Sequence, residues 1–247
     1  MLGKFIKKLG YVVAFDTSLS EQSPLNTDNL WVLEVVSTHM ISDQFIQHLA
    51  ERLQAPLPGP EAQFRMAHVA RRHAAMPPPN ARQASVLALF YPKALDWHIV
   101  LIEREQNNPN DRHGGQISFP GGKHEADDAT LMHTALREAE EEVGAPAEQV
   151  QILGALTPLY IPVSNFQVNP FVGFLSDMPT FRLQTEEVRS ILEVDFRTLR
   201  APHTRQSTTI RIASNVALSN VPYFNVQGKV VWGATAMILN ELLELSA

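Results

Sequence analysis

The first sustained pattern of apolar residues along the chain lies at residues 41–53. Apolar side chains recur there at helical spacing, and Ser42 or Asp43 is a suitable N-cap, so the pattern predicts an amphipathic helix. Residues 1–39 show no sustained period and are rich in short polar residues that favour turns. We therefore expect residues 1–39 to be an N-terminal extension that is poorly ordered, or an artefact of start-site choice if the natural start is Met40.

From Ala84 onward the pattern changes to short apolar runs separated by turn residues, which is typical of strands. These runs occupy residues 84–91, 97–104, 117–119, 150–157, 169–175 and 187–196. A hairpin is expected from 208–213 to 230–233, with turns at 220–222 and 225–228, and residues 234–245 return to helical spacing. Strands and helices that do not alternate strictly favour a mixed sheet with helices on both faces. We therefore predict one domain of the α/β (α+β) class over residues 40–247, with an N-terminal helical lead-in.

The segment 128–143 has the clearest helical pattern in the chain. Asp127 or Asp128 is a suitable N-cap, while Gly144 and Pro146 are typical of a helix end. Winding the segment at 100° per residue gathers one apolar arc, which we expect to face the core: Met132, Ala135, Leu136, Ala139 and Val143. A second arc beside it is acidic and consists of Glu138, Glu141 and Glu142, whereas Glu140 points away.

Acidic residues near the C-terminal end work against a helix. Each one opposes the macrodipole by roughly 0.3–1 kcal/mol, and like charges four residues apart repel each other. A bound divalent cation would compensate, because carboxylates at i, i+3 and i+4 offer the hard oxygen ligands that Mg²⁺ or Mn²⁺ prefers. A solvated acidic surface is the alternative interpretation. The sequence "FPGGK" just ahead of the helix favours the cation, since paired glycines let the backbone approach a ligand closely.

Composition limits the classes of function. The 247 residues carry a formal net charge of −6, and Lys and Arg form no run longer than a pair, which argues against binding to nucleic acid or to anionic membranes. The chain has no Cys, which excludes disulfides and thiolate metal sites and fits a cytoplasmic location. No stretch approaches the roughly 18 apolar residues of a transmembrane helix. Neither nucleic acid nor a membrane is therefore the expected partner, and the sequence leaves a homodimer open.

Residues 121–145, "GGKHEADDATLMHTALREAEEEVGA", resemble the Nudix box. The second half of that pattern, Arg-Glu-apolar-any-Glu-Glu-any-Gly-apolar, matches residues 137–145 without a gap. The first half fits if one extra residue is allowed, which puts Gly122 in the glycine position and Asp128 in the place of a Glu. The resemblance implies a Nudix-type α/β/α sandwich with a mixed sheet between helices, and metal-dependent hydrolysis of a nucleoside diphosphate derivative.

The longer segment "HGGQISFPGGKHEADD", residues 113–128, is similar to the coenzyme A pyrophosphatase branch of that family. The similarity extends from about residue 41 to residues 232–239. It implies cleavage of coenzyme A, or of its derivatives, to 3′,5′-ADP and 4′-phosphopantetheine. Two alternatives remain: a Nudix hydrolase of ADP-ribose, NADH or a sugar nucleotide, and a non-catalytic module that binds a nucleotide.

The resemblance also assigns roles to residues. Glu138, Glu141, Glu142 and the carbonyl group of Gly122 are the implied ligands of Mg²⁺ or Mn²⁺. Arg137 is expected to pair with the box carboxylates, and Glu138 is the simplest candidate for the base. The candidate substrate-binding residues are Arg104, Arg112, His113, Gly121, Gly122 and Lys123. A further catalytic acid from outside the box would be Glu186 or Glu187.

Overall fold

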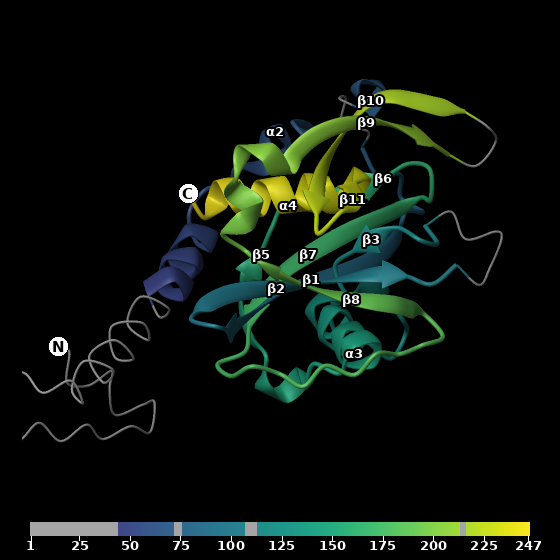
Figure 1. Ribbon diagram of the computed structural model, residues 1–247. Coiled ribbons are helices and arrows are strands. Elements are labelled where there is room, and N and C mark those ends of the chain that lie inside the picture. The colour runs from purple at the N-terminus through teal and green to yellow at the C-terminus, as the bar shows by residue number, and fades with distance from the viewer. Residues whose placement is uncertain (1–43, 72–75, 107–112, 213–215) are drawn as a thin grey trace, which may run out of the picture. The chain divides into compact units, whose positions relative to one another are not determined.

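The computed structural model describes residues 44–71, 76–106, 113–212 and 216–247 (Figure 1). The predictions for residues 1–39, for the caps Ser42 and Asp43, and for Arg112 lie outside these described residues. The helices are α2 (Gly59–Phe64), α3 (Leu131–Val143) and α4 (Gly233–Leu245), in addition to a helical segment at 44–53. The strands are β1 (Arg82–Lys93), β2 (Asp96–Arg104), β3 (Ile117–Ser118), β4 (Gly121–Lys123), β5 (Gln151–Ala155), β6 (Leu159–Ile161), β7 (Phe166–Phe174), β8 (Val188–Asp195), β9 (Arg205–Arg211), β10 (Ala217–Val226) and β11 (Lys229–Trp232).

The strands form two sheets. The larger has eight strands with the central order β3-β2-β1-β7-β5, and β4, β6 and β8 pair with β1, β7 and β2 respectively. Strands β1 and β7 are parallel, whereas the other pairs are antiparallel. The smaller sheet is the antiparallel set β11-β10-β9. The predicted mixed sheet is therefore confirmed.

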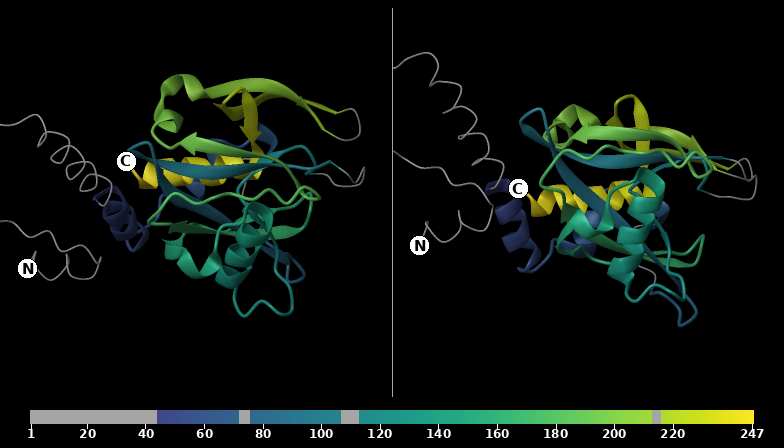
Figure 2. Two further views of the ribbon diagram at one scale, coloured as in Figure 1. Left: turned by 60° about the horizontal axis from the view of Figure 1, so that its bottom comes forward. Right: turned by 90° about the horizontal axis from the view of Figure 1, so that it is seen from below.

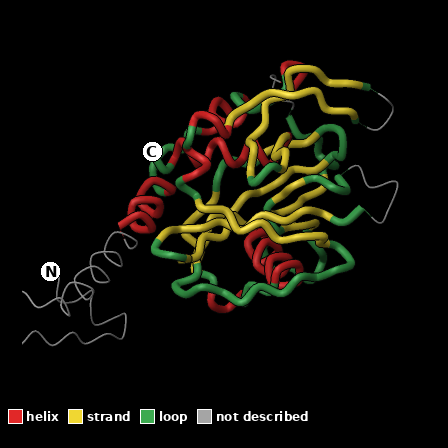
Figure 3. Tube along the Cα trace, viewed as in Figure 1, coloured by secondary structure: helices red, strands yellow, loops and turns green. Residues whose placement is uncertain are grey.

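Helices α3 and α4 lie on opposite faces of the large sheet (Figures 1 and 2), and Figure 3 shows the strands as the layer between them. Alternation along β1 explains the two faces, because successive strand residues point to opposite sides. Leu87 and Leu89 pack in one cluster with Ala139 of α3, while Ala88 and Phe90 belong to a second cluster with α4. The predicted core face of α3 is confirmed except at Met132, which is exposed and lies on the first turn of the helix.

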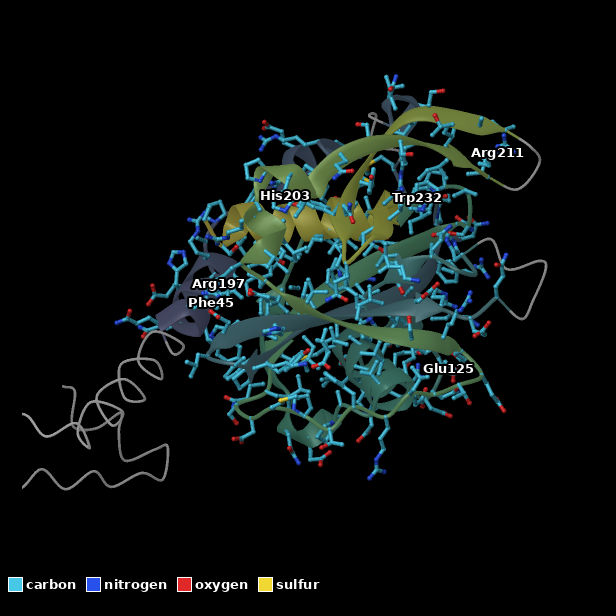
Figure 4. The ribbon with its side chains drawn as sticks, in the orientation of Figure 1. Phe45, Glu125, Arg197, His203, Arg211 and Trp232 are labelled. Atoms are coloured by element: carbon cyan, nitrogen blue, oxygen red, sulfur yellow. The ribbon has the colours of Figure 1, made fainter. Side chains whose placement is uncertain are left out.

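The helical segment at 44–53 closes one end of the α4-side core. Ile46, Leu49 and Leu53 are buried at the predicted helical spacing. The ring of Phe45, labelled in Figure 4, lies 5.6 Å from that of Phe90 and 5.8 Å from that of Phe196, measured between ring centroids. This part of the predicted lead-in helix is thus confirmed.

The hairpin that we predicted near the C-terminus differs in one turn. The turn at residues 225–228 is present between β10 and β11, with Gly228 at a φ of +81°. The turn expected at 220–222 is wrong, because β10 continues through these residues with only an irregularity in register between Leu218 and Val221. Asn220 adopts the left-handed conformation, with a φ of +57°, within that irregularity. An Asn and a Pro so close together were therefore a signal of the bulge and not of a chain reversal.

Strands β1 and β2 separate at one end, and this separation creates the space for the candidate site. The two strands pair next to their connecting turn, from Lys93 opposite Asp96 to Phe90 opposite Ile99, and they separate beyond Phe90 and Ile99. Farther along, β4 pairs with the beginning of β1, and β3 pairs with the end of β2. The "FPGGK" segment is thus inserted between the two strands, in direct reach of α3.

Candidate active site

The two glycines of the inserted segment occupy positions that no other residue can fill without displacement. A Cβ on Gly121 would lie 2.6 Å from the Cα of Val86, and the φ of Gly121 is +151°. A Cβ on Gly122 would lie 2.6 Å from Oε2 of Glu138. Gly121 therefore allows the backbone of β4 to pack on β1, and Gly122 allows a carboxylate of α3 to lie against the backbone. The sequence placed both glycines in a turn, but the structure places them in β4.

Helix α3 begins three residues later than predicted. Its N-cap is Thr130, whose hydroxyl oxygen accepts a hydrogen bond from the His133 amide at 3.1 Å, so the expected cap at Asp127 or Asp128 is wrong. Gly144 ends the helix in the left-handed conformation, with a φ of +71°, as predicted. Thr130 and not Asp128 caps the helix, because the Asp128 carboxylate is bound to other donors.

Asp128 is buried and bound to several donors at once. Its oxygens accept hydrogen bonds from the Glu125 amide at 3.0 Å, from Thr134 Oγ1 at 2.9 Å, and from Arg137 Nε and Nη2 at 2.8 and 3.0 Å. The Arg137 guanidinium holds the pKa of Asp128 well below its ordinary value, and the other two donors act in the same direction. Asp128 thus anchors the loop before α3, where Figure 4 labels Glu125, to the helix itself.

Arg137 extends the same network to the acidic arc. Its Nη2 donates to Glu138 Oε1 at 3.0 Å and its Nη1 donates to Glu141 Oε2 at 2.9 Å. A planar guanidinium with five N–H donors can bind several carboxylates at fixed angles, which a Lys cannot do. The pairing that we expected of Arg137 is present, and its strongest partner is Asp128.

We expect Asp128→Asn to lower the free energy of unfolding by about 3 kcal/mol at pH 7, because it breaks a buried ion pair on one side. The sign of the pH dependence follows from the lowered pKa of Asp128. The stabilisation is complete above the ordinary Asp pKa of about 4 and is lost as the pH falls below it. Urea titrations at pH 7 and at pH 3 should therefore show a difference between wild type and variant that shrinks in acid. Asp127→Asn, at the exposed neighbouring position, is the matched control, and equal effects of the two substitutions would contradict this assignment.

Glu142 is the most deeply buried acid of the site. Its side chain is 2% exposed, and its Oε2 accepts a hydrogen bond from the Gly121 amide at 2.8 Å. Its Oε1 has no hydrogen-bond donor within the described ranges, and the nearest cation, Arg104 Nη1, lies 3.7 Å away. Burial raises the pKa of Glu142 to about 8, against the effects of Gly121 and Arg104. A carboxylate held in this way is poised to receive a positive charge.

Glu138 and Glu187 lie near enough to Glu142 to influence it. Burial raises the pKa of Glu138, which Arg137 opposes, and the negative charge of Glu187 raises the pKa of both Glu138 and Glu142. Glu187 directly precedes β8, where Val188 pairs with Arg104. Of the two acids considered outside the box, Glu187 is coupled electrostatically to the acidic arc. The pairing of Val188 with Arg104, which the sequence does not reveal, brings Glu187 to this place.

Comparisons with known proteins agree with this geometry. The NUDIX domain profile matches residues 81–207. The chain is 30% identical over 212 residues to the "Uncharacterized Nudix hydrolase NudL" of Yersinia pestis (strain Pestoides F), a match that covers 84% of this chain and 98% of the relative. The chain belongs to the Nudix hydrolase family. The matched range includes both the acidic arc of α3 and the "FPGGK" segment, the two parts in which the sequence resembles a Nudix box.

Other relatives extend the comparison. NudL of Yersinia enterocolitica serotype O:8 is 40% identical over 134 residues, which is 54% of this chain and 67% of that protein. A solved Nudix hydrolase from M. smegmatis, RenU, is 16% identical with a TM-score of 0.46 and covers 67% of this chain and 85% of that chain. A C. elegans Ap4A hydrolase in a binary complex is 16% identical with a TM-score of 0.39 and covers 47% of this chain and 82% of that chain.

The residues of this Nudix hydrolase fit a divalent metal ion in part. Within the described ranges, no three or more His, Asp or Glu side chains already surround a common point. The unsatisfied Oε1 of Glu142 and the contact of Glu138 with Gly122 nevertheless provide adjacent hard oxygen ligands. Glu141 is 57% exposed and held by Arg137. The donor set therefore suits Mg²⁺ or Mn²⁺, with two of the three carboxylates already turned toward the glycines.

Four of the candidate substrate-binding residues of this Nudix hydrolase lie close to the acidic arc, and Arg112 lies outside the described residues. Arg104 ends β2 and faces Glu142, and the Nδ1 of His113 lies 3.4 Å from Gln116 Oε1 in the turn that leads to β3. Lys123 is exposed at the end of β4, and its carbonyl oxygen accepts a hydrogen bond from Arg137 at 3.3 Å. The structure thus gathers Arg104, Gly121, Gly122 and Lys123 at the separation of β1 and β2.

No helix in the described residues has the length and the apolar character needed to cross a membrane.

Proposed function

We propose that this Nudix hydrolase cleaves the diphosphate bond of coenzyme A, or of its derivatives, to give 3′,5′-ADP and 4′-phosphopantetheine. The observation that carries the reaction class is the buried Glu142 oxygen without a donor, next to Gly121 and Arg104. The choice of coenzyme A is supported by the similarity of residues 113–128 to that branch of the family.

The residues have separate tasks in the proposed reaction. Glu138, Glu142 and the Gly122 carbonyl group would hold Mg²⁺ or Mn²⁺, and Glu141 would join them on release from Arg137. Such an ion polarises phosphoryl oxygens and lowers the pKa of bound water. Arg104, whose Nη1 lies 3.7 Å from Glu142 Oε1, would pair with a phosphate oxygen. Lys123 would add a second positive charge at the separation of β1 and β2.

The proton of the attacking water would pass to a carboxylate. Glu138 is the first candidate, because burial raises its pKa and so makes it a stronger base than an exposed Glu. Arg137 holds Glu138 Oε1, which leaves Oε2, an oxygen that also lies close to Gly122, to accept the proton. Glu187 is the candidate for an acid outside the box that assists, because its charge acts on both Glu138 and Glu142.

The test is a comparison of substrates. With Mg²⁺ or Mn²⁺, we expect the purified protein to convert coenzyme A to two products that chromatography identifies as 3′,5′-ADP and 4′-phosphopantetheine. ADP-ribose, NADH and a sugar nucleotide should be cleaved with lower kcat/KM. A protein that cleaves ADP-ribose or NADH but leaves coenzyme A intact would support the alternative Nudix hydrolase. Binding of coenzyme A without any turnover would support the non-catalytic module.

A further inference from the structure

A cavity of about 160 Å³ lies beside β6, at the outer edge of the large sheet and apart from the acidic arc. Its walls are mostly apolar and include Pro60, Phe64, Pro158 and Tyr160. Three polar side chains, Gln63, Arg71 and Gln167, also line it. A mainly apolar cavity with a few convergent polar groups is the usual form of a small-ligand site.

Arg71 brings a positive charge to this cavity without a carboxylate to balance it. Its Nη2 donates to the carbonyl oxygen of Tyr160 at 3.0 Å, and among the described residues it forms no ion pair. Burial lowers the pKa of the Arg71 guanidinium, with no opposing charge. Arg65, in contrast, is exposed and pairs with Glu61 at 2.9 Å and with Glu244 at 2.6 Å. A guanidinium has five N–H donors, so most of those on Arg71 remain available.

Gln167 offers a second unused polar group. In the described part of the chain its side-chain amide has no hydrogen-bond partner, although its backbone carbonyl accepts one from Asn169. The other glutamine of the wall, Gln63, is fully engaged, because its Nε2 donates to the Thr157 carbonyl and to Glu241, each at 2.7 Å. Gln167 and Arg71 therefore have spare donors, whereas Gln63 maintains the fold.

The cavity is within reach of a substrate bound at the glycines. Strand β6 is the third strand from β4, by way of β1 and β7. Neighbouring strands are about 4.8 Å apart, so the separation is about 14 Å. Gln167 points to the same face of the sheet as Phe171, which packs with α3. Leu159 and Phe64, in contrast, belong to the cluster on the α4 side, so the cavity lies at the edge between the two faces. A group of the substrate that lies several bonds from the diphosphate could thus enter the cavity.

The charge of the cavity differs from that of the larger groove on the other side of the acidic arc. That groove, of about 690 Å³, lies between α3 and residues 175–184 and contains Glu140, Glu141, Asp177 and Arg182. Three acids and one base repel an anion, whereas Arg71 in apolar surroundings attracts one strongly. Of the two, the cavity beside β6 is suited to a negative charge.

We propose that the cavity beside β6 binds a terminal anionic group of the substrate, a phosphate or a carboxylate, which Arg71 pairs with and Gln167 orients. The proposal rests on the proposed function for the identity of the substrate. Under that function the anion has two sources. It is either the 3′-phosphate of coenzyme A or a carboxylate on an acyl group carried by its thiol.

The test is Arg71→Gln in the full chain, with four substrates. These are coenzyme A, dephospho-coenzyme A, and the butyryl and succinyl thioesters of coenzyme A. If the cavity binds the 3′-phosphate, kcat/KM should fall on the order of 10- to 100-fold for coenzyme A and remain unchanged for dephospho-coenzyme A. If it binds an acyl carboxylate, the loss should be confined to the succinyl thioester.

Three further variants make the result decisive. Arg71→Lys keeps the charge and should recover part of the lost kcat/KM. Gln167→Leu should lower kcat/KM for the same substrate alone, and it leaves the hydrogen bond between Arg71 and the Tyr160 carbonyl in place. Arg65→Gln is the matched control and should change none of the four rates. Equal losses for all four substrates with Arg71→Gln, or no loss for any of them, would overturn the proposal.

The outcome is separable from that of the proposed function. If the wild type cleaves NADH and not coenzyme A, the proposed function fails, but the cavity can still be tested. NADPH and NADH then replace coenzyme A and dephospho-coenzyme A as the two substrates that differ by one terminal phosphate. If it cleaves neither, calorimetric binding of the same pairs to wild type and to Arg71→Gln gives the same comparison. A preference for the anionic member that disappears in the variant supports the cavity assignment in each case.

Discussion

Replacement of Glu142 by Gln is expected to lower kcat by about 10² or more and, at the same time, to stabilise the metal-free protein at neutral pH. The loss of activity follows from the loss of a charged oxygen at the place where the proposed divalent ion binds. The gain in stability follows from burial, because Gln has nearly the same shape as Glu but no charge to desolvate. Opposite signs for activity and stability are typical of residues that are strained for function.

The pH dependence gives this prediction its sign. Burial raises the pKa of Glu142 to about 8 in the folded protein, whereas an unfolded Glu titrates near 4.3. The folded state therefore binds more protons, so stability is fully present below about pH 4 and falls as the pH rises toward 8. We expect the metal-free wild type to lose a few kcal/mol over this range, and Glu142→Gln to lose less. Mg²⁺ or Mn²⁺ should restore the stability of the wild type alone.

Urea titrations at pH 5, 7 and 8, with and without the metal ion, measure the stability, and product formation from coenzyme A or another cleaved substrate measures kcat. Glu140→Gln is the matched control. Glu140 lies on the same turn of α3, but it is exposed, and its Oε1 accepts a long hydrogen bond of 3.4 Å from the Ala147 amide. A Glu142→Gln protein with near-normal kcat, or with the pH dependence of the wild type, would refute the role assigned to Glu142.

The second large effect concerns the two glycines, which should respond differently to the same change. Gly121→Ala is expected to destabilise the fold by more than about 3 kcal/mol, because the new Cβ meets the backbone of β1 and the φ of +151° is unfavourable for Ala. Backbone atoms of a buried strand cannot move aside. This variant should therefore lose its cooperative unfolding transition at moderate temperature or accumulate as insoluble protein.

Gly122→Ala should instead leave the fold largely intact and remove activity. Its Cβ would meet the carboxylate of Glu138, which is the end of a side chain and can rotate away. The rotation moves Glu138 from its place beside Arg137 and the glycines, so kcat should fall by about 10² or more. Thermal unfolding and kcat of both variants test the contrast. Gly228→Ala is the control for backbone conformation alone, because its φ is +81° and a Cβ there would contact nothing. Equal destabilisation by Gly121→Ala and Gly228→Ala would show that the clash with β1 is not what matters.

Local patterns predicted much of the framework, since these features depend on residues that are close in the sequence. Gly144 ends α3 because glycine adopts the left-handed conformation most easily, and this could be read from its position after the helical period. The face formed by Ala135, Ala139 and Val143 followed from the 100° repeat. Glu138 and Glu142 were placed together for the same reason. The N-cap was missed because Asp128 and Thr130 both have suitable side chains, and only the position of Arg137 decides between them.

Other features could not be predicted because they depend on segments that are far apart in the sequence. The sequence identified Glu186 and Glu187 as equivalent candidates, and the pairing of Val188 with Arg104 is what brings Glu187 toward the site. Gly121 and Gly122 were assigned to a turn, since no local pattern predicts that β1 and β2 separate and admit them as a strand. Arg71 was overlooked entirely. It lies shortly before a proline-rich segment, and the neighbouring sequence does not indicate that no carboxylate pairs with it.

The sequence by itself determined that three carboxylates lie on one helical arc just behind a pair of glycines, because helix geometry and short-range spacing require it. Only the tertiary structure decided how these carboxylates differ. Glu142 is buried against Gly121, Glu138 fills the space left by Gly122, and Glu141 stays in solvent with Arg137. The physical reason is that the burial of each acid, and with it the raised pKa of Glu138 and Glu142, is set by the residues that the sheet places opposite the helix. Strand pairing between distant segments of the chain decides which residues these are.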